Sequence, residues 1–466
     1  MSVRSRPAWI WGLAALTAAG AALRFATLSV QSFWLDEAVT HQLVTKSLGG
    51  MLDAIPHSES TPPLYYVVAW LWVRVFGAGE AGLRSLSALL GTATIVVLAL
   101  IARRLAGERA ALAAAALAAT NPLLIWYSQE ARAYMLLVLL CALTVWCLLR
   151  SDWRGWALAA ALALATHYFA VFVVVPEIAW LAIVHARRSR SAALAVGGVL
   201  VVGAALLPLA VVQAGQGRAA FIHASSLGTR IAEIPKQFLI GYAAPYATVL
   251  TIVAVALAVA LAAQLRGSDR GMLALAALAV GVPVVLAPLG ADYVITRNVI
   301  VALVPLIALA GVAVARTRIG PLLAAGICAA GIAAFVGVEA TPADQRDDWR
   351  GVAKAIGRQT VGPRVVIVDP ASGVPALQLY MPSLRRITQT SSPSVAAREI
   401  DVIDVARQPP DPATPIPLPG FTTSVVHTET FTLVRYLAPA AITEGFVGIA
   451  SRALVPASGP ALLRGS

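Results

Sequence analysis

Two adjacent carboxylates, Asp36 and Glu37, follow the first long apolar stretch of the chain, within the segment Ser32–Ala38. Acidic side chains beside a bilayer boundary cost free energy unless they are solvated, paired or used in chemistry. Taken alone, the segment is explained equally well by a solvated loop and by a reactive site. The rest of the chain has to decide between these two interpretations.

Several cations make up a second candidate set. They lie in loops that the charge pattern described below assigns to the outer face, where basic residues are disfavoured. An arginine presents a planar, permanently charged fork that matches phosphate oxygens. A snorkelling or paired side chain explains any one of them, but their grouping with the acids favours phosphate recognition. The set is Arg132, Arg218, Arg230, Lys236 and Arg297.

The composition places these groups in a membrane protein. The chain has 466 residues, of which 59% are hydrophobic and 12% charged, with a mean hydropathy of +0.79; soluble domains have roughly 25% charged residues. The net charge of +12 comes mostly from short loops and not from one patch, which argues against a nucleic-acid partner. Cys141, Cys147 and Cys328 lie in apolar stretches, so no disulfide framework is expected.

Apolar stretches of bilayer-spanning length follow one another, and the arginine-rich loops between them fit an N-terminus in the cytoplasm. We expect the first stretch to be an uncleaved span and not a signal peptide. The predicted spans are 8–28, 82–103, 109–126, 133–149, 154–167, 169–185, 192–212, 246–265, 271–289, 298–315 and 319–338.

The sequence therefore predicts an α-helical polytopic membrane protein with about 11 transmembrane helices. The transmembrane domain is 1–338, and its first outer loop, 29–80, carries interfacial helices near 39–52 and 65–76. Residues 339–466 form a soluble domain, which lies outside the cell after an odd number of spans. Its pattern predicts an extracytoplasmic α/β domain with helices at 347–359 and 374–381, strands at 364–369, 422–427 and 430–436, and a proline-rich loop at 408–419.

Five short segments, in this order, resemble one enzyme family. The chain resembles the integral-membrane glycosyltransferases of the C superfamily, specifically the family 39-like enzymes related to protein O-mannosyltransferases and the lipid A aminoarabinose transferase. The resemblance implies transfer of a sugar, with inversion, from a polyprenyl-phosphate donor to a glycan, lipid or protein acceptor at the outer face of the plasma membrane. The segments are Ser32–Ala38, Pro62–Tyr66, Trp126–Tyr134, Thr166–Phe169 and Asp347–Arg350.

The resemblance also implies roles for individual residues. Asp36 becomes the general base, which agrees with the ability of a carboxylate to accept a hydroxyl proton. Glu37 positions Asp36, binds a metal or contacts the acceptor. Arg132 is the first choice for the donor phosphate and Arg297 the second, followed by Arg230 and Lys236. The residues expected to contact substrate are Gln129, Glu130, Tyr65, Tyr66, Tyr127, Tyr293 and His57, although interfacial aromatic belts and ion pairing explain several of them.

A divalent metal ion, either zinc, manganese or magnesium, is a further expectation from the resemblance. Glu59 and His167 are its candidate ligands, with His57 as an alternative, and no fixed ligand spacing supports the choice. The segment Asp347–Arg350 is expected to be structural. The alternative function is a transporter or flippase of lipid-linked sugars. Transporters often show inverted repeats and acids or broken helices near mid-membrane; neither is evident in the sequence, where the acids cluster at one face. A noncatalytic scaffold would leave the matched loops unexplained.

Overall fold

The fold is described from a computed structural model, which covers residues 8–186, 189–357, 362–386, 394–405, 417–445 and 461–465. Arg187, Arg188 and most of the predicted proline-rich loop lie outside the described residues. The chain divides into two compact units. The first contains residues 1–28 and 43–337, and the second contains 29–42 together with 338–466. The acid pair thus belongs to the same unit as the C-terminal domain.

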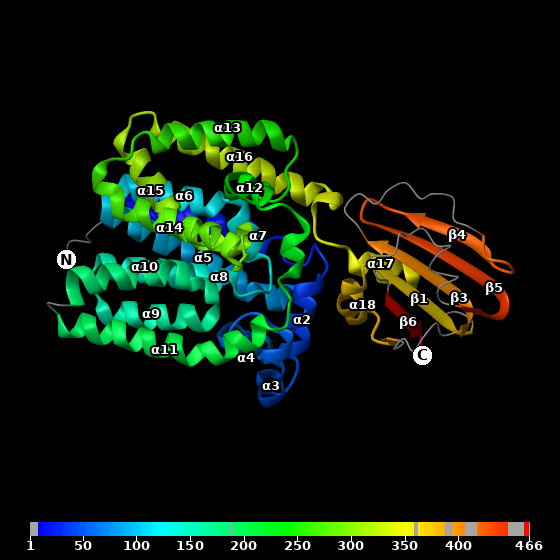
Figure 1. The fold of residues 1–466 in the computed structure, drawn as a ribbon. Helices are drawn as coiled ribbons and strands as arrows, with labels where there is room; N and C mark the ends of the chain where they lie inside the picture. Colours follow the sequence, from blue (N-terminus) through cyan, green and yellow to red (C-terminus); the bar gives the residue numbers. More distant parts are fainter. Residues whose placement is uncertain are drawn as a thin grey trace, which may run out of the picture. The chain divides into compact units, whose positions relative to one another are not determined.

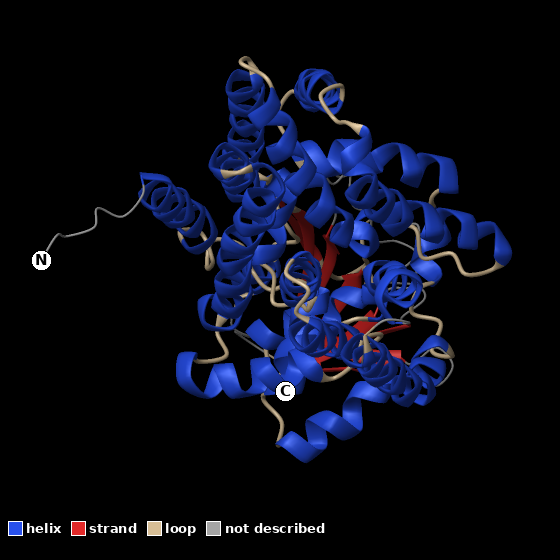
Figure 2. Cartoon of the chain, turned by 90° about the vertical axis from the view of Figure 1, so that its left-hand side faces the viewer, coloured by secondary structure: helices blue, strands red, loops and turns tan. Residues whose placement is uncertain are grey.

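The first unit is a bundle of helices (Figures 1 and 2). All eleven predicted spans coincide with helical segments. These are α1 (Ala8–Phe25), α5 (Glu80–Ala106), α6 (Glu108–Thr120) with α7 (Pro122–Ser128), α8 (Tyr134–Leu149), α9 (Trp153–Thr166), α10 (Val171–Leu181), α11 (Arg190–Ala214), α13 (Ala247–Ala262), α14 (Arg270–Leu286), α15 (Leu303–Arg316) and α16 (Gly320–Ala340).

Within the described residues, seven helical stretches are long and apolar enough to cross a membrane, judged by length and composition. An eighth is added if the bent pair α6 and α7 is one span. The expected class, a polytopic helical membrane protein, is confirmed, whereas the expected number of about 11 spans stays a prediction. The helices α8 and α13 are apolar but shorter.

Small side chains allow the central helices to approach closely. The alanine-rich helix α6 packs against α1, α5 and α15. A Cβ on Gly311 of α15 would lie 2.6 Å from the carbonyl oxygen of Ala110, and one on Gly20 of α1 would lie 3.0 Å from the Cβ of Ala119. In membranes such close packing replaces the hydrophobic effect as the force between helices. The glycines therefore set the spacing of the central helices.

A break between α6 and α7 directs the chain toward the predicted second outer loop, which contains Trp126–Tyr134. Pro122 has no N–H, so the carbonyl of Ala118 loses its helical partner, and the two helices meet at an angle of 59°. Arg24 of α1 is fully buried and donates hydrogen bonds to the carbonyls of Ala118 (2.9 Å) and Ala119 (3.0 Å). Its side chain thereby satisfies the backbone that the proline leaves open.

The predicted first outer loop contains three helices: α2 (Leu35–Val44), α3 (Leu48–Ser58) and α4 (Leu64–Phe76). The expected interfacial helix near 39–52 covers the end of α2 and the start of α3, and the other one corresponds to α4. A further helix, α12 (Leu227–Ile240), lies in the predicted fourth outer loop, which runs from Gln213 to Pro245.

The second unit contains a six-stranded mixed sheet with the order β2-β6-β1-β3-β5-β4, in which only β1 and β3 pair in parallel (Figure 1). The predicted α/β domain is confirmed, although β2, β3 and β6 were not foreseen. The strands are β1 (Arg364–Asp369), β2 (Leu384–Arg386), β3 (Ser394–Val405), β4 (Thr422–His427), β5 (Phe431–Gly445) and β6 (Ala461–Gly465).

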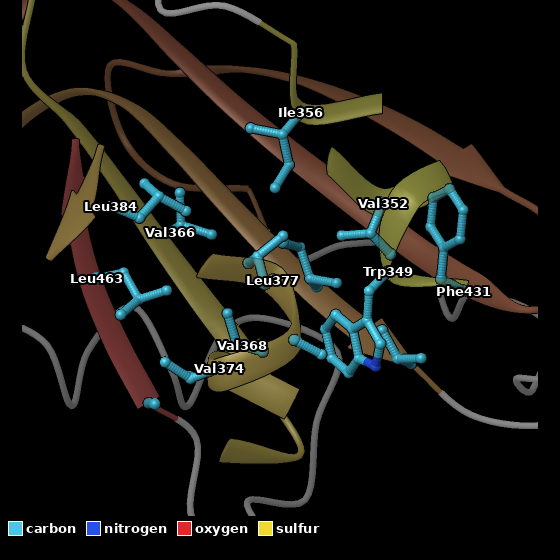
Figure 3. Packing of buried hydrophobic residues seen from close by; sticks show 14 of the residues in the cluster. Trp349, Val352, Ile356, Val366, Val368, Val374, Leu377, Leu384, Phe431 and Leu463 are labelled. Atoms are coloured by element: carbon cyan, nitrogen blue, oxygen red, sulfur yellow. The ribbon is translucent and has the colours of Figure 1, made fainter. Parts of the chain in front are cut away.

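Two helices, α17 (Trp349–Ile356) and α18 (Val374–Tyr380), supply one of the two apolar cores of this sheet. Trp349, Val352 and Leu377 pack with residues of β1, β3, β5 and β6. Figure 3 labels those of β1, β5 and β6. Ala38 of α2 belongs to the same core. The N-terminal segment that carries the acid pair is thus packed into the core of the C-terminal unit.

Candidate functional site

The acid pair lies in the first turn of α2. Asp36 is half-buried and Glu37 is fully buried. Acidic residues are favourable there because the backbone N–H groups of a first turn carry partial positive charge. The hydroxyl of Thr40, one turn further along α2, donates a hydrogen bond to the backbone carbonyl of Asp36 at 3.1 Å.

The segment Asp347–Arg350 binds the residues that precede α2. The hydroxyl of Ser32 donates to the carbonyl of Asp347 at 2.8 Å and accepts from the backbone N–H of Trp349 at 3.0 Å. The guanidinium of Arg350 donates to the carbonyls of Ser29 and Val30. Two sequence motifs that lie 315 residues apart are therefore one structural element.

Further contacts from the same unit complete this attachment. The backbone N–H of Phe33 donates to the phenol oxygen of Tyr380 at 2.7 Å. The side-chain oxygen of Gln31 accepts from the backbone N–H of Arg346 at 3.1 Å and from its guanidinium at 3.3 Å. The backbone just before the acid pair is thus bound on several sides.

In the first unit, Arg132 forms an ion pair with Glu59 at 3.0 Å. Both side chains are largely buried, with 12% and 3% exposed. Tyr66 joins them, because its hydroxyl pairs with Thr61 at 3.1 Å and also hydrogen-bonds Glu59. The structure therefore combines the predicted phosphate ligand Arg132 with the predicted metal ligand Glu59.

Aromatic rings from four predicted outer loops and the helices beside them form a continuous series, which we call the ring row. Tyr242 contacts Tyr127 through their hydroxyls and rings, and Tyr127 lies 4.6 Å from the ring of Tyr134. The next centroid distances along the row are 5.6, 4.9 and 5.8 Å. The ring row is Tyr242, Tyr127, Tyr134, His167, Phe169 and Tyr293.

Arg297 lies close to the Tyr127 end of the ring row. Burial raises the pKa of the Tyr242 phenol, whereas the hydrogen bond with Tyr127 and the positive charge of Arg297 lower that pKa. Arg297 is half-buried and also stacks over the ring of Phe221, 5.2 Å from its centroid. A cation beside several aromatic faces and phenol groups provides the kind of surface that binds a sugar phosphate.

The other two predicted phosphate ligands differ from Arg132 and Arg297. Arg230 makes a two-pronged ion pair with Asp292 at 2.8 and 2.6 Å, and it donates to the carbonyls of Val294 and Ser225. Hydrogen bonds from Arg230 lower the pKa of Asp292 to about 2. This arrangement favours a structural role for Arg230. Lys236 is half-buried on the same helix, and no ion pair links it to this set within the described residues.

The remaining predicted substrate residues are placed as follows. The amide of Gln129 donates to the carbonyl of Leu23 at 3.1 Å and to the hydroxyl of Thr27 at 2.7 Å, which attaches the second outer loop to the end of α1. Glu130 and Tyr65 are buried, and the Tyr65 ring meets Tyr66 edge-on. His57 is exposed, and its carbonyl accepts from Arg218. Gln129 and Arg218 thus donate hydrogen bonds to backbone carbonyls, which accounts for them by a structural role.

Glu59 and His167 do not fit a metal centre well. Glu59 is already neutralised by Arg132, and a guanidinium at 3.0 Å repels a divalent cation. The Nδ1 atom of His167 accepts from the backbone N–H of Phe169 at 3.2 Å. Within the described residues, no group of three or more histidine, cysteine or acidic side chains is arranged to hold an ion. We therefore route no chemical step through a metal at these two residues.

Three residues of this region were missed in the sequence. Arg24 could have been noticed, because a charged residue inside an apolar span is rare and usually has a task. Tyr242 and Gln213 carry no such signal. The amide of Gln213 donates to the carbonyls of Ile55 (3.3 Å) and Thr61 (3.1 Å), and its oxygen accepts from Tyr168 at 2.8 Å. Gln213 thus fixes the turn that carries Glu59.

Comparison with family models finds a match over residues 60–212 to the family described as Dolichyl-phosphate-mannose-protein mannosyltransferase. This match covers the Pro62–Tyr66, Trp126–Tyr134 and Thr166–Phe169 segments. A search of curated proteins finds no matching sequence.

Among solved structures, the chain is similar to ArnT from Cupriavidus metallidurans bound to undecaprenyl phosphate. The identity is 16% and the TM-score is 0.57, with 94% of this chain and 100% of ArnT covered. The oligosaccharyltransferase of Archaeoglobus fulgidus, in complex with Zn and sulfate, matches with 12% identity, 74% and 55% coverage and a TM-score of 0.44. The family match and the ArnT-like fold together confirm the resemblance predicted from the sequence.

Proposed function

We propose that this chain, which shares the fold of the C-superfamily glycosyltransferases and resembles family 39 in residues 60–212, moves a sugar from a polyprenyl-phosphate donor to an acceptor hydroxyl at the outer face of the plasma membrane. The acceptor is a glycan, a lipid or a protein. Membrane lipids surround the apolar helices.

The observation that carries the proposal is the association of Arg132 and Arg297 with the ring row. Arg132 lies in the chain between two rings of the row, Tyr127 and Tyr134. Arg297 follows the last ring, Tyr293, by four residues and stacks over Phe221. ArnT, whose fold this chain shares, was crystallised with undecaprenyl phosphate, a ligand that joins an anionic head to an apolar chain. An arginine-bearing aromatic surface within a bundle of apolar helices suits both parts of such a ligand.

In the proposed reaction, Asp36 accepts the proton of the acceptor hydroxyl. The hydroxyl oxygen attacks C1 of the sugar while the bond from C1 to the phosphate oxygen breaks, so that the configuration at C1 inverts. The electron pair of the broken bond leaves with the polyprenyl phosphate. Glu37, buried one residue further along, positions Asp36.

The departing phosphate gains negative charge in the transition state. A cation aimed at it lowers the barrier, because it stabilises the transition state more than the bound donor. We assign this task to Arg132, oriented by Glu59, and to Arg297. Tyr127 and Tyr293 of the ring row would stack on the sugar or the prenyl group.

The test is transfer of a labelled sugar by the purified protein in lipid vesicles, with a panel of polyprenyl-phosphate sugars as donors. We expect Asp36→Asn to abolish transfer while donor binding persists. Full activity of Asp36→Asn would remove this residue from its role. Movement of intact donor across the vesicle bilayer without transfer would instead identify a flippase.

Metal dependence stays a proposal that a separate experiment decides. The protein is treated with a chelator, and zinc, manganese or magnesium is then added back. Loss of transfer that one of these ions restores would show dependence on a metal ion. Activity that persists through chelation would agree with the poor fit of Glu59 and His167 to an ion.

A further inference from the structure

We propose that the C-terminal unit is part of the catalytic apparatus, because its Tyr380 and the Ser32 bonds to α17 are positioning contacts for Asp36. This inference rests on the proposed function, since it takes Asp36 to be the general base. It gives the C-terminal domain a role in the reaction, namely positioning the proposed general base.

The contacts concern the backbone from which α2 starts. The first helical hydrogen bond of this turn runs from the N–H of Ala38 to the carbonyl of Trp34, at 2.9 Å. The N–H of Phe33 therefore precedes the helix, and Tyr380 binds it at 2.7 Å. Ser32, one residue earlier, is held by a donated bond and an accepted bond at the start of α17. Two consecutive residues before the helix are thereby attached to two different helices of the domain.

Contacts within the C-terminal unit hold the start of α17 in place. Asp348 caps its first turn by accepting from the N–H of Gly351 at 2.9 Å, and Trp349 is fully buried in the core that Figure 3 shows. A Cβ on Gly373 would lie 1.9 Å from the Trp349 ring, so this ring has no room to shift toward Gly373. Because α17 is part of this core, its bonds to Ser32 fix the backbone before Asp36 relative to the core.

Two arginines of the sheet, Arg364 and Arg435, hold the other end of α17. Arg435 donates to the carbonyls of Ala355 (3.2 Å) and Ile356 (2.7 Å), and Arg364 donates to that of Gly357 at 2.9 Å. Both arginines are paired with Asp401 in the sheet. Cations near the last carbonyls stabilise a helix end. The helix that binds Ser32 is consequently fixed at both ends.

Such positioning matters because proton transfer needs a donor–acceptor distance of about 3 Å. Side chains near the start of a helix follow the direction in which the helix begins, and Asp36 is the second residue of α2. A displacement of about 1 Å in a catalytic group can cost roughly 10²-fold in rate. Loss of one positioning bond should therefore lower kcat and leave donor binding unchanged.

The experiment compares Tyr380→Phe, which removes only the hydroxyl that binds Phe33, with Ser32→Ala, which removes the bonds to Asp347 and Trp349 where α17 begins. The control is Tyr436→Phe, the same chemical change in the other apolar core of the sheet. Transfer kinetics, donor binding and melting temperature are measured on the full-length protein in vesicles. Hydrogen exchange of peptides that cover residues 30–38 reports directly on the Phe33 and Ser32 contacts.

We expect Tyr380→Phe and Ser32→Ala each to lower kcat at least about tenfold, with the KM for donor within about twofold, faster exchange in 30–38, and a melting temperature equal to that of Tyr436→Phe. Normal kcat in both variants, with Asp36→Asn inactive, would overturn the inference alone. An equal fall of kcat in Tyr436→Phe would also overturn it, because the effect would then be general destabilisation.

Failure of the proposed function is recognised separately. Absence of transfer by the wild-type protein from every donor, or full activity of Asp36→Asn, would refute the function. In that case the exchange measurement would still show whether Tyr380 and Ser32 hold the segment, but the positioning role would be overturned with the reaction.

Discussion

At the scale of single residues, the ion pair of Arg132 and Glu59 sets the orientation of the guanidinium that we propose binds the donor phosphate. A guanidinium has five N–H donors, more than one carboxylate oxygen can accept. Glu59 fixes the orientation in which Arg132 presents its guanidinium. The same pairing explains why Glu59 is a poor metal ligand.

We predict that Arg132→Ala lowers kcat by about 10²-fold, because the lost charge acts on the departing phosphate. Its KM for the donor should rise more than its KM for the acceptor, because the donor carries that phosphate. Arg132→Lys, which keeps the charge and loses the fork, should be intermediate. The double variant Glu59→Gln with Arg132→Ala controls for leaving a buried carboxylate unpaired. A larger rise in KM for the acceptor than for the donor would contradict the assignment.

The pair of Arg230 and Asp292 predicts a pH dependence of stability. Arg230 lowers the pKa of Asp292 to about 2 in the folded state, against an ordinary value of 3.8. The unfolded state therefore binds more protons between these values. The stabilisation is present above about pH 4 and is lost as the pH falls through about 2. Thermal unfolding in detergent should show this acid-side loss in the wild type, and Asp292→Asn should lack that component; an unchanged profile in the variant would contradict the pairing.

At the scale of elements, the bend between α6 and α7 creates the route to the second outer loop. Arg24 satisfies the two carbonyls at the bend, and its Nε donates to the Ser128 hydroxyl at the end of α7, at 3.1 Å. Backbone groups without partners are costly inside a bilayer. One arginine of α1 thus holds the two pieces of a broken helix in place.

We predict that Arg24→Met destabilises the first unit by about 2–6 kcal/mol, since two buried carbonyls lose partners worth about 1–3 kcal/mol each. Arg109→Met is the matched control, because Arg109 is exposed at the start of α6. The melting temperature in detergent is the measurement. Equal stability of the two variants would show that the bend does not depend on Arg24.

At the scale of the whole molecule, the two units interleave in sequence. The segment Ser29–Gln42 belongs to the second unit, although residues on both sides of it belong to the first. A division of the chain at one point near residue 338 would therefore separate the acid pair from the domain that binds its backbone. The unit that carries the proposed base is assembled from both ends of the chain.

The orientation in the membrane is a prediction at this scale. We expect Ser424→Cys, exposed on β4, to react in intact cells with a maleimide that cannot cross the membrane. Ser268→Cys, exposed in the predicted cytoplasmic loop between α13 and α14, should react only after permeabilisation. The reverse pattern would place the C-terminal unit in the cytoplasm and remove the proposed outer-face reaction.

The sequence by itself determined the helical membrane class, the helical segments and much of the C-terminal α/β pattern. These features depend on the length of apolar stretches and on strand periodicity, which are properties of neighbouring residues. The resemblance to the glycosyltransferases was also readable from short motifs.

Only the tertiary structure decided which partners these residues have. Ser32 binds the segment at Asp347 from 315 positions away, Arg230 is engaged by Asp292, and Arg24 serves a broken helix. Hydrogen bonds act over about 3 Å, so a partner is chosen by the packing that brings two distant residues together, and no local pattern records that choice. The acid pair at Asp36 and the C-terminal domain were both visible in the sequence, whereas the contacts that join them were not.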